Sequence, residues 1–214
     1  MPVTLPLVTQ KIAARLMRAV GIVALAASSA CAKASAPAPA TPPSPTDSSG
    51  PLLKGFSSDT ATLTLACMPS GFEICFDAID NNCNGIIDEG CGVTTGLLQF
   101  TIAWDDSEAD VDLTVFDPSG DKSSVDTSSK HGLIKDRNCP APNDQCGGQN
   151  TENVYLTKKH AVEGAYVVQI TLHRLGSKPP PVRVQVATRI GQKSYHAVVE
   201  LDELGASQQL HFSL

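Results

Sequence analysis

Between residues 97 and 214, several segments alternate apolar and polar residues with a period of two. Such alternation turns one face of a β-strand toward a core and the other face toward solvent. Clusters of Gly, Pro and Asp separate the alternating segments, as turns between strands require. The pattern predicts six strands, at residues 97–104, 111–116, 165–174, 182–190, 194–201 and 208–214.

No segment of helix length shows a convincing 3.6-residue periodicity, so we expect an all-β fold. Several short strands separated by turns predict an antiparallel β-sandwich over residues 96–214. The strand phase directs one set of side chains inward, namely Phe100, Ile102, Trp104, Val168, Ile170, Leu172, Val182, Val184, Val186, Tyr195, Ala197, Val199, Leu201, Leu210, Phe212 and Leu214. Three histidines, His173, His196 and His211, have the opposite phase. Ordinary solvated strand positions are the favoured explanation, and a transition-metal patch on one sheet is the alternative.

The beginning of the chain has the pattern of an export signal. A basic segment, residues 11–18, precedes an apolar run over 19–30 that is too short to span a bilayer as a helix. Small residues then precede Cys31, which resembles the bacterial lipobox. That resemblance implies lipidation of Cys31 and, because Ala32 follows, a lipoprotein at the outer membrane or cell surface of a Gram-negative bacterium. Secretion without a lipid is the alternative.

Composition changes sharply along the first half of the chain. Ala, Pro, Ser and Thr dominate the segment after Cys31, and such a segment forms an extended tether rather than a core. We therefore expect a signal peptide at 1–30, a lipid-anchored disordered tether at 31–52, a disulfide-framed metal-binding segment at 53–95 and the β-sandwich at 96–214.

Charge and cysteine count limit the partners and the compartment. The net charge of −6 argues against a nucleic-acid partner. Without Cys31, an even number of cysteines remains, which suits three disulfides in an exported protein. We expect Cys139 and Cys146 to pair locally, whereas the pairing among the other four stays open: Cys67, Cys75, Cys83 and Cys91.

An acidic loop lies between these four cysteines, within CFDAIDNNCNGIIDEGC (residues 75–91). Counted from Asp80, oxygen-bearing side chains recur at every second position and a glycine follows, as at the start of an EF-hand loop. Cys91 stands where an EF-hand has its bidentate glutamate, so we expect weak binding of Ca²⁺. The predicted ligands are Asp80, Asn82, Asn84, the carbonyl of Ile86 and Asp88, with Glu89 or Asp77 as candidates to complete the shell.

The segment CMPSGFEICFDAIDNNCNGIIDEGC (residues 67–91) resembles the repeat of MopE-type metal-binding motifs, found in bacterial surface and secreted proteins. That resemblance implies a metal site, for which calcium fits the oxygen ligands. Two other interpretations stay open. Zinc is disfavoured because exported thiols oxidise and no histidine lies nearby. A disulfide-knotted linker whose acids are merely solvated would bind no metal.

A second acidic stretch, WDDSEADVDLTVFDPSG (residues 104–120), resembles the opening of a YfaP-like bacterial β-sandwich domain. Asp110 and Asp112 share a strand face beside a turn that supplies Asp105. Two carboxylates so close favour a cation between them, which makes these three residues a further candidate calcium site. Aspartates that only cap backbone N–H groups in a solvated turn are the alternative.

Catalytic motifs for zinc proteases, serine hydrolases, phosphate-binding loops and dinucleotide folds are missing from the sequence, so we expect no enzyme. The sequence predicts a surface-anchored lipoprotein with a calcium-binding loop and a β-sandwich for binding or display. The alternative is an accessory module that docks an exported protease or polysaccharide, with the metal incidental. A copper-handling surface protein ranks lower because hard oxygens suit copper poorly. The ligand, the partner and the oligomeric state are open.

Overall fold

A computed structural model describes residues 50–65, 67, 69–140 and 146–214. The predicted signal peptide, the lipidation site Cys31 and almost all of the tether lie outside these residues. No helix that could span a membrane occurs in the described part. The strands of that part are β1 (Gly55–Ser58), β2 (Leu98–Trp104), β3 (Asp110–Phe116), β4 (Ile134–Arg137), β5 (Thr151–Leu156), β6 (Ala165–Arg174), β7 (Val182–Ile190), β8 (Lys193–Leu201) and β9 (Ser207–Ser213).

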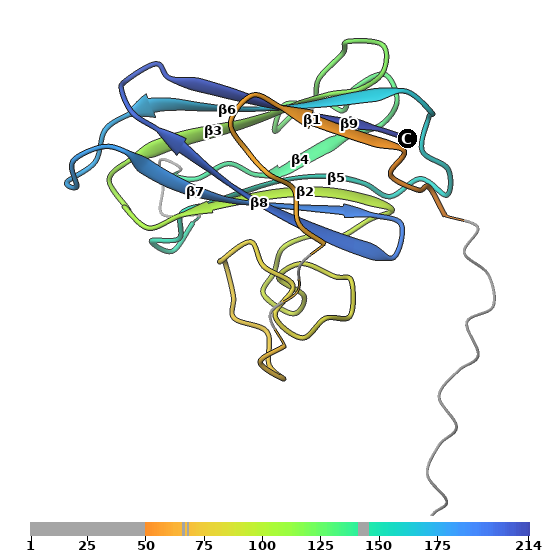
Figure 1. The fold of residues 1–214 in the computed structure, drawn as a ribbon, viewed down its shortest axis with the longest axis horizontal. Helices are drawn as coiled ribbons and strands as arrows, with labels where there is room; N and C mark the ends of the chain where they lie inside the picture. Colours follow the sequence, from red (N-terminus) through yellow and green to blue (C-terminus); the bar gives the residue numbers. More distant parts are fainter. Residues whose placement is uncertain (1–49, 66, 68, 141–145) are drawn as a thin grey trace, which may run out of the picture. The chain divides into compact units, whose positions relative to one another are not determined.

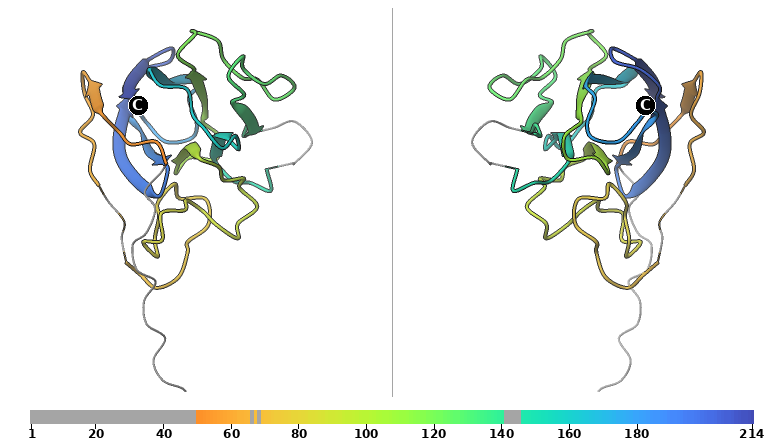
Figure 2. Two further views of the ribbon diagram at one scale, coloured as in Figure 1. Left: turned by 90° about the vertical axis from the view of Figure 1, so that its right-hand side faces the viewer. Right: turned by 90° about the vertical axis from the view of Figure 1, so that its left-hand side faces the viewer.

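The strands form two antiparallel sheets, as Figure 1 and the views along the strands in Figure 2 show. Sheet A has the order β1-β9-β6-β3, and sheet B has the order β4-β5-β2-β7-β8. The all-β sandwich predicted from the sequence is confirmed, and the six predicted strands correspond to β2, β3 and β6–β9. Their predicted inward side chains form the core between the sheets, with Tyr195 only partly buried at its margin.

The alternation did not reveal three strands: β1, β4 and β5. β1 lies within the range that we assigned to the metal-binding segment, yet it pairs with β9 at the edge of sheet A. β4 and β5 pair with each other in sheet B and turn the charged Lys135 and Glu152 into the protein. Because polar residues occupy inward positions of these two strands, their hydrophobic pattern is too weak to predict them.

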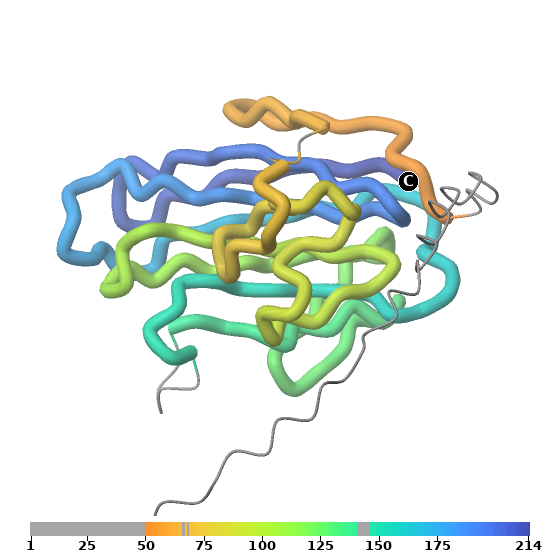
Figure 3. The backbone as a smooth tube through the Cα atoms, turned by 90° about the horizontal axis from the view of Figure 1, so that it is seen from below, coloured from red at the N-terminus to blue at the C-terminus, as the bar shows by residue number. Residues whose placement is uncertain are grey.

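Segment 59–96 covers the outer face of sheet B, as Figure 3 shows. Together with the core on the inner face, the segment buries every residue of β2. Ala78 and Ile87 of the segment pack against Ala103 of β2 and Ala187 of β7 in a second, small apolar cluster. The cysteine-framed segment therefore has no core of its own and uses the sheet as its base.

Polar contacts also hold the segment on sheet B. The buried Gln99 Nε2 donates to the carbonyl of Ile87 (3.3 Å) and to Thr101 and Asn153 of the sheet. Thr101 Oγ1 donates to Asn153 Oδ1 (2.8 Å), and Asn153 Nδ2 donates to the carbonyl of Thr94 (2.8 Å). Because buried polar groups without hydrogen-bond partners destabilise the folded state, this network favours one position of the segment on sheet B.

The three strand histidines do not form the patch that one shared sheet would give. His173 on β6 and His211 on β9 belong to sheet A, whereas His196 on β8 belongs to sheet B. His173 Nε2 lies 3.0 Å from Asp112, and His196 Nε2 lies 2.7 Å from Gln185. The interpretation as a single transition-metal patch is therefore wrong, because the chain order places the strands in different layers.

Gly85 allows the segment to approach the β7–β8 turn. Its φ is 82°, and a Cβ there would lie 2.3 Å from the carbonyl oxygen of Gln192. We expect Gly85→Ala to lower the melting temperature by more than Gly90→Ala does. Gly90 is the matched control, because its φ is 78° but a Cβ would meet nothing within 4 Å. The left-handed backbone alone costs about 1 kcal/mol for alanine, so equal shifts in a thermal melt would contradict a role for the close approach.

Candidate metal site

Two interleaved disulfides hold the segment that carries the candidate ligands. Cys67 pairs with Cys83 and Cys75 pairs with Cys91, each across 16 residues. These two pairings settle the connectivity that the sequence left open. The predicted local disulfide between Cys139 and Cys146 is also present. Since residues 67–91 contain no described strand or helix, the disulfides and the sheet beneath them fix the shape of the loop.

The backbone of the loop is unusually strained. All four non-glycine residues with positive φ in the described part fall within it: Phe76 (67°), Ala78 (54°), Cys83 (65°) and Asp88 (52°). Left-handed backbone is unfavourable for residues with a Cβ and persists only where the surroundings over-determine it. The loop is thus held in a specific conformation, and Asp88 is one of the residues so held.

Asp80, at the first position of the predicted calcium loop, anchors the loop to the sandwich. Its Oδ1 accepts from the N–H of Asn84 (3.1 Å), and its Oδ2 accepts from the N–H of Gly85 (2.9 Å) and from Ser194 Oγ (2.6 Å) on β8. The side chain is almost fully buried. Burial lowers the pKa of Arg189, and the nearby charge of Asp80 opposes that change. Asp80 therefore shapes the turn and joins it to sheet B.

Three predicted ligands meet at one point of the loop. The side-chain amides of Asn82 and Asn84 both donate to Glu89 Oε1. The other oxygen of that carboxylate, Oε2, is buried and has no hydrogen-bond partner. Glu89 rather than Asp77 thus lies beside Asn82 and Asn84, where a ligand shell would be completed.

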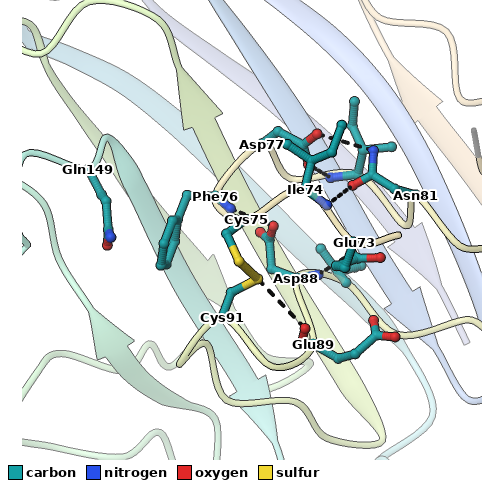
Figure 4. The surroundings of a disulfide bond; sticks show 12 residues. Glu73, Ile74, Cys75, Phe76, Asp77, Asn81, Asp88, Glu89, Cys91 and Gln149 are labelled. Carbon is teal, nitrogen blue, oxygen red and sulfur yellow. Dashed lines mark hydrogen bonds between the residues drawn. A yellow bond between two sulfur atoms is a disulfide. The ribbon is translucent and has the colours of Figure 1, made fainter. Parts of the chain in front are cut away.

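Glu73 and Asp88 add two more carboxylates with a buried oxygen that lacks a partner. Glu73 Oε1 accepts from the N–H of Asp88 (2.9 Å), and Asp88 Oδ1 accepts from the N–H of Phe76 (2.7 Å). In contrast, Glu73 Oε2 and Asp88 Oδ2 accept no hydrogen bond. Figure 4 shows Glu73, Asp88 and Glu89 around the Cys75–Cys91 disulfide. Three oxygens of this kind within one loop are rare, because a buried acceptor without a donor is costly.

The pKa values of these carboxyls reflect the same crowding. Burial, followed by the charge of Glu89, raises the pKa of Glu73 to about 7. Burial raises the pKa of Asp88 to about 6, and the charge of Asp77 acts in the same direction. A bound cation would stabilise the ionised carboxylates and oppose both increases.

Asp77 and Ile86 are placed differently. Asp77 Oδ1 accepts from the N–H of Ile79 (3.0 Å), and its Oδ2 accepts from Asn81 Nδ2 (3.2 Å), so both oxygens are engaged within the turn. Asn81 Oδ1 in turn accepts from the N–H of Ile74 (2.9 Å). The N–H of Ile86 donates to Asn84 Oδ1 (2.8 Å), which keeps its backbone next to the predicted ligands.

The donor set of the loop consists of oxygen atoms, which fits a hard cation. Among the described residues, no three His, Cys, Asp or Glu side chains are gathered closely enough to hold a metal ion by themselves. A cation in this loop would therefore need the amide oxygens of Asn82 and Asn84 or backbone carbonyls as well. Calcium has such mixed shells of carboxylate, amide and carbonyl oxygens. The three carboxylate oxygens without partners belong to Glu73, Asp88 and Glu89.

The second predicted cluster is not gathered at one point. Asp105 is exposed and lies 2.9 Å from Lys178 Nζ. Asp110 and Asp112 share β3, but a bulge separates them, and each lies near a basic side chain of β6: Arg174 at 3.9 Å and His173 at 3.0 Å. Asp106, which is not among the predicted ligands, accepts from the N–H of Lys178 (2.8 Å) and of Glu108 (3.1 Å).

Three residues of the site are not among the ligands predicted from the sequence. Glu73 lies before the EF-hand-like stretch, although it is in register with the repeat that the segment resembles. Ser194 and Arg189 come from β8 and β7, and only the docking of the loop brings them to Asp80. The register of Glu73 was the one signal that could have identified it.

Comparison with known proteins supports a metal site in this loop. Residues 66–89 match the family model Cu-binding_MopE, described as "Putative metal-binding motif". The chain thus carries a metal-binding motif whose match ends at Glu89, and Glu73, Asp80, Asn82, Asn84 and Asp88 lie within it. Searches of curated proteins and of solved structures found no match.

Proposed function

We propose that the cysteine-framed loop binds Ca²⁺ and that the protein is an exported, lipid-anchored surface module. The observation that carries the proposal is the set of buried oxygens without partners on Glu73, Asp88 and Glu89. One or two of these carboxylates, together with the amide oxygen of Asn82 and backbone carbonyls, would hold a calcium ion that gives their free oxygens a partner and offsets the repulsion between the ionised side chains. Ca²⁺ would supply positive charge and coordination only, because the disulfides and sheet B already fix the shape of the loop.

Copper is the alternative metal, because the matching motif is named for copper binding. The donor types favour calcium. Copper prefers imidazole, thiolate and thioether ligands, yet the described part of the loop holds no histidine and its cysteines are oxidised. Oxygen donors remain, and these suit hard cations.

Binding in this loop would affect the sandwich, because the two share buried contacts. Asp80 reaches Ser194 of β8, and Ile87 accepts from Gln99 of β2. A ligand that binds only the folded loop stabilises everything that unfolds with it. We therefore infer that extracellular calcium stiffens the module, while lipidation at Cys31 would hold it at the outer membrane.

An accessory docking module is the second candidate function. Three apolar side chains on the segment are exposed: Phe72 (83%), Leu65 (71%) and Ile74 (56%). A contiguous patch of exposed apolar groups is the kind of surface that a partner would cover. Retention of a co-exported protease or of surface polysaccharide by the immobilised chain, lost in Phe72→Ser, would support this function.

Thermal melts of the oxidised chain in EDTA and in millimolar Ca²⁺ test the calcium proposal. We expect calcium to raise the melting temperature of the wild type and of Asp110→Ala, and to leave Asp80→Ala unchanged. A hundredfold excess over Kd corresponds to about 2.7 kcal/mol. Asp110→Ala is the matched control because it removes an aspartate of the sandwich. A shift lost in Asp110→Ala but kept in Asp80→Ala would place the ion elsewhere, and no shift in the wild type would refute the proposal.

A further inference from the structure

A buried Lys–Glu pair lies inside the sandwich, apart from the metal-binding loop. Lys135 Nζ lies 2.8 Å from Glu152 Oε2, and the side chains are 9% and 0% exposed. Glu152 of β5 is paired with the core residue Ile102, and Lys135 of β4 with the core residue Val154, so both side chains point between the sheets. Every other ion pair of the described residues has at least one partner exposed by 25% or more.

The two carboxylate oxygens of Glu152 differ in their hydrogen-bond partners. Oε2 accepts from the N–H of Leu113 (2.6 Å), which lies on β3, an edge strand of sheet A. Oε1 is buried and has no hydrogen-bond partner. Burial raises the pKa of Glu152 to about 8, although the charge of Lys135 opposes the increase. The site is thus a buried contact between the Lys135 amine and the Glu152 carboxyl group, with one backbone N–H donating to Oε2.

We propose that Lys135 and Glu152 condense to an amide that links β4 to β5. A proton moves from the Lys135 ammonium to Glu152 Oε2, 2.8 Å away, and the neutral Nζ then attacks Cδ. In the adduct, Oε1 takes one proton from Nζ and one from Oε2 and leaves as water. Oε2 becomes the carbonyl oxygen of the amide, and the N–H of Leu113 stabilises the negative charge that develops on it. One C–N bond forms, one C–O bond breaks, and no oxidant or reductant takes part.

The buried environment favours this product over the ion pair. An ion pair removed from water has a desolvation cost that its mutual attraction does not always offset. The amide removes both charges, keeps the carbonyl oxygen that accepts from Leu113, and expels Oε1, the oxygen that has no partner in the ion pair. Contact distance, burial and a positioned donor also give the proximity that accelerates reactions between two groups.

Mass spectrometry of the intact full-length chain tests the proposal, with Lys135→Arg as the comparison. The arginine keeps the charge opposite Glu152 but offers no amine that condenses, and N-terminal processing is the same in both proteins. After the mass difference between lysine and arginine is subtracted, we expect the wild type to be lighter than Lys135→Arg by the mass of one water molecule. Fragment spectra should place the link between Lys135 and Glu152. A difference equal to the substitution alone, or a water loss that persists in Lys135→Arg, would overturn the proposal.

Discussion

Replacing both partners of the Cys75–Cys91 disulfide with serine is expected to abolish calcium binding. This disulfide holds the strand-free segment at Glu73 and Phe76 against Asp88, where two hydrogen bonds join them. A disulfide that closes a loop of this size contributes about 2–4 kcal/mol. Without it, the left-handed backbone at Phe76 and Asp88 has little to hold it. The measurement is a calcium titration by isothermal calorimetry.

The matched control removes the Cys139–Cys146 disulfide in the same way. That bridge closes a loop with a sequence separation of 7 outside segment 59–96, so calcium binding should survive its loss. The melting temperatures of both variants show whether each still folds. Wild-type affinity in the folded Cys75→Ser/Cys91→Ser variant would mean that the disulfide does not organise the metal site.

Calcium affinity is expected to fall about twentyfold between pH 8 and pH 6, because protons compete for the same oxygens. Glu73 has a pKa of about 7 and Asp88 a pKa of about 6, both raised by burial. The pKa of each carboxyl is higher in the folded protein than in the unfolded chain. The metal-free protein therefore becomes less stable as the pH rises from the unfolded-state pKa to the folded-state pKa. Calcium reverses that trend, since it binds the ionised form.

The readout for this prediction is affinity rather than melting temperature. The melting temperature also reports the titration of every other group whose pKa differs between the folded and unfolded sandwich, and this would obscure the effect. Glu73→Gln serves as the comparison, because it removes one competing proton. Its affinity should be weaker but should depend less on pH than that of the wild type. An equal affinity of the wild type at pH 6 and pH 8 would contradict a role for these carboxylates.

Hydrophobic periodicity was sufficient to predict the sandwich where one strand face is polar and solvated. It was insufficient where tertiary contacts bury polar side chains. Gln99 and Thr101 read as solvent-facing residues of β2, but segment 59–96 covers them and gives them partners. The pattern missed β5 for the same reason, because the inward Glu152 forms an ion pair with Lys135 of β4. Such pairings join residues far apart in sequence, and no local pattern contains them.

The candidate metal site was likewise predictable only where its contacts are local in sequence. The spacing of Asp80, Asn82 and Asn84 placed the turn correctly, since the Asx contacts that shape it are local. Glu73 reaches the site through the Cys75–Cys91 disulfide, whose pairing the sequence left open. On the sandwich, the spacing of Asp110 and Asp112 suggested a second site, but the basic side chains near them, Arg174 and His173, come from β6, which is remote in sequence.

Calorimetric titration of the oxidised chain with Ca²⁺, before and after Glu89→Gln, tests the central claim most directly. Glu89 is the carboxylate beside both Asn82 and Asn84, and its exchange for glutamine keeps size and shape while removing the charge. We predict one calcium per chain, a Kd within the micromolar to millimolar range of extracellular modules, and affinity at least about tenfold weaker in the variant, the equivalent of one charge-assisted contact. Binding of Cu²⁺ but not Ca²⁺, or unchanged calcium binding in Glu89→Gln, would contradict the account.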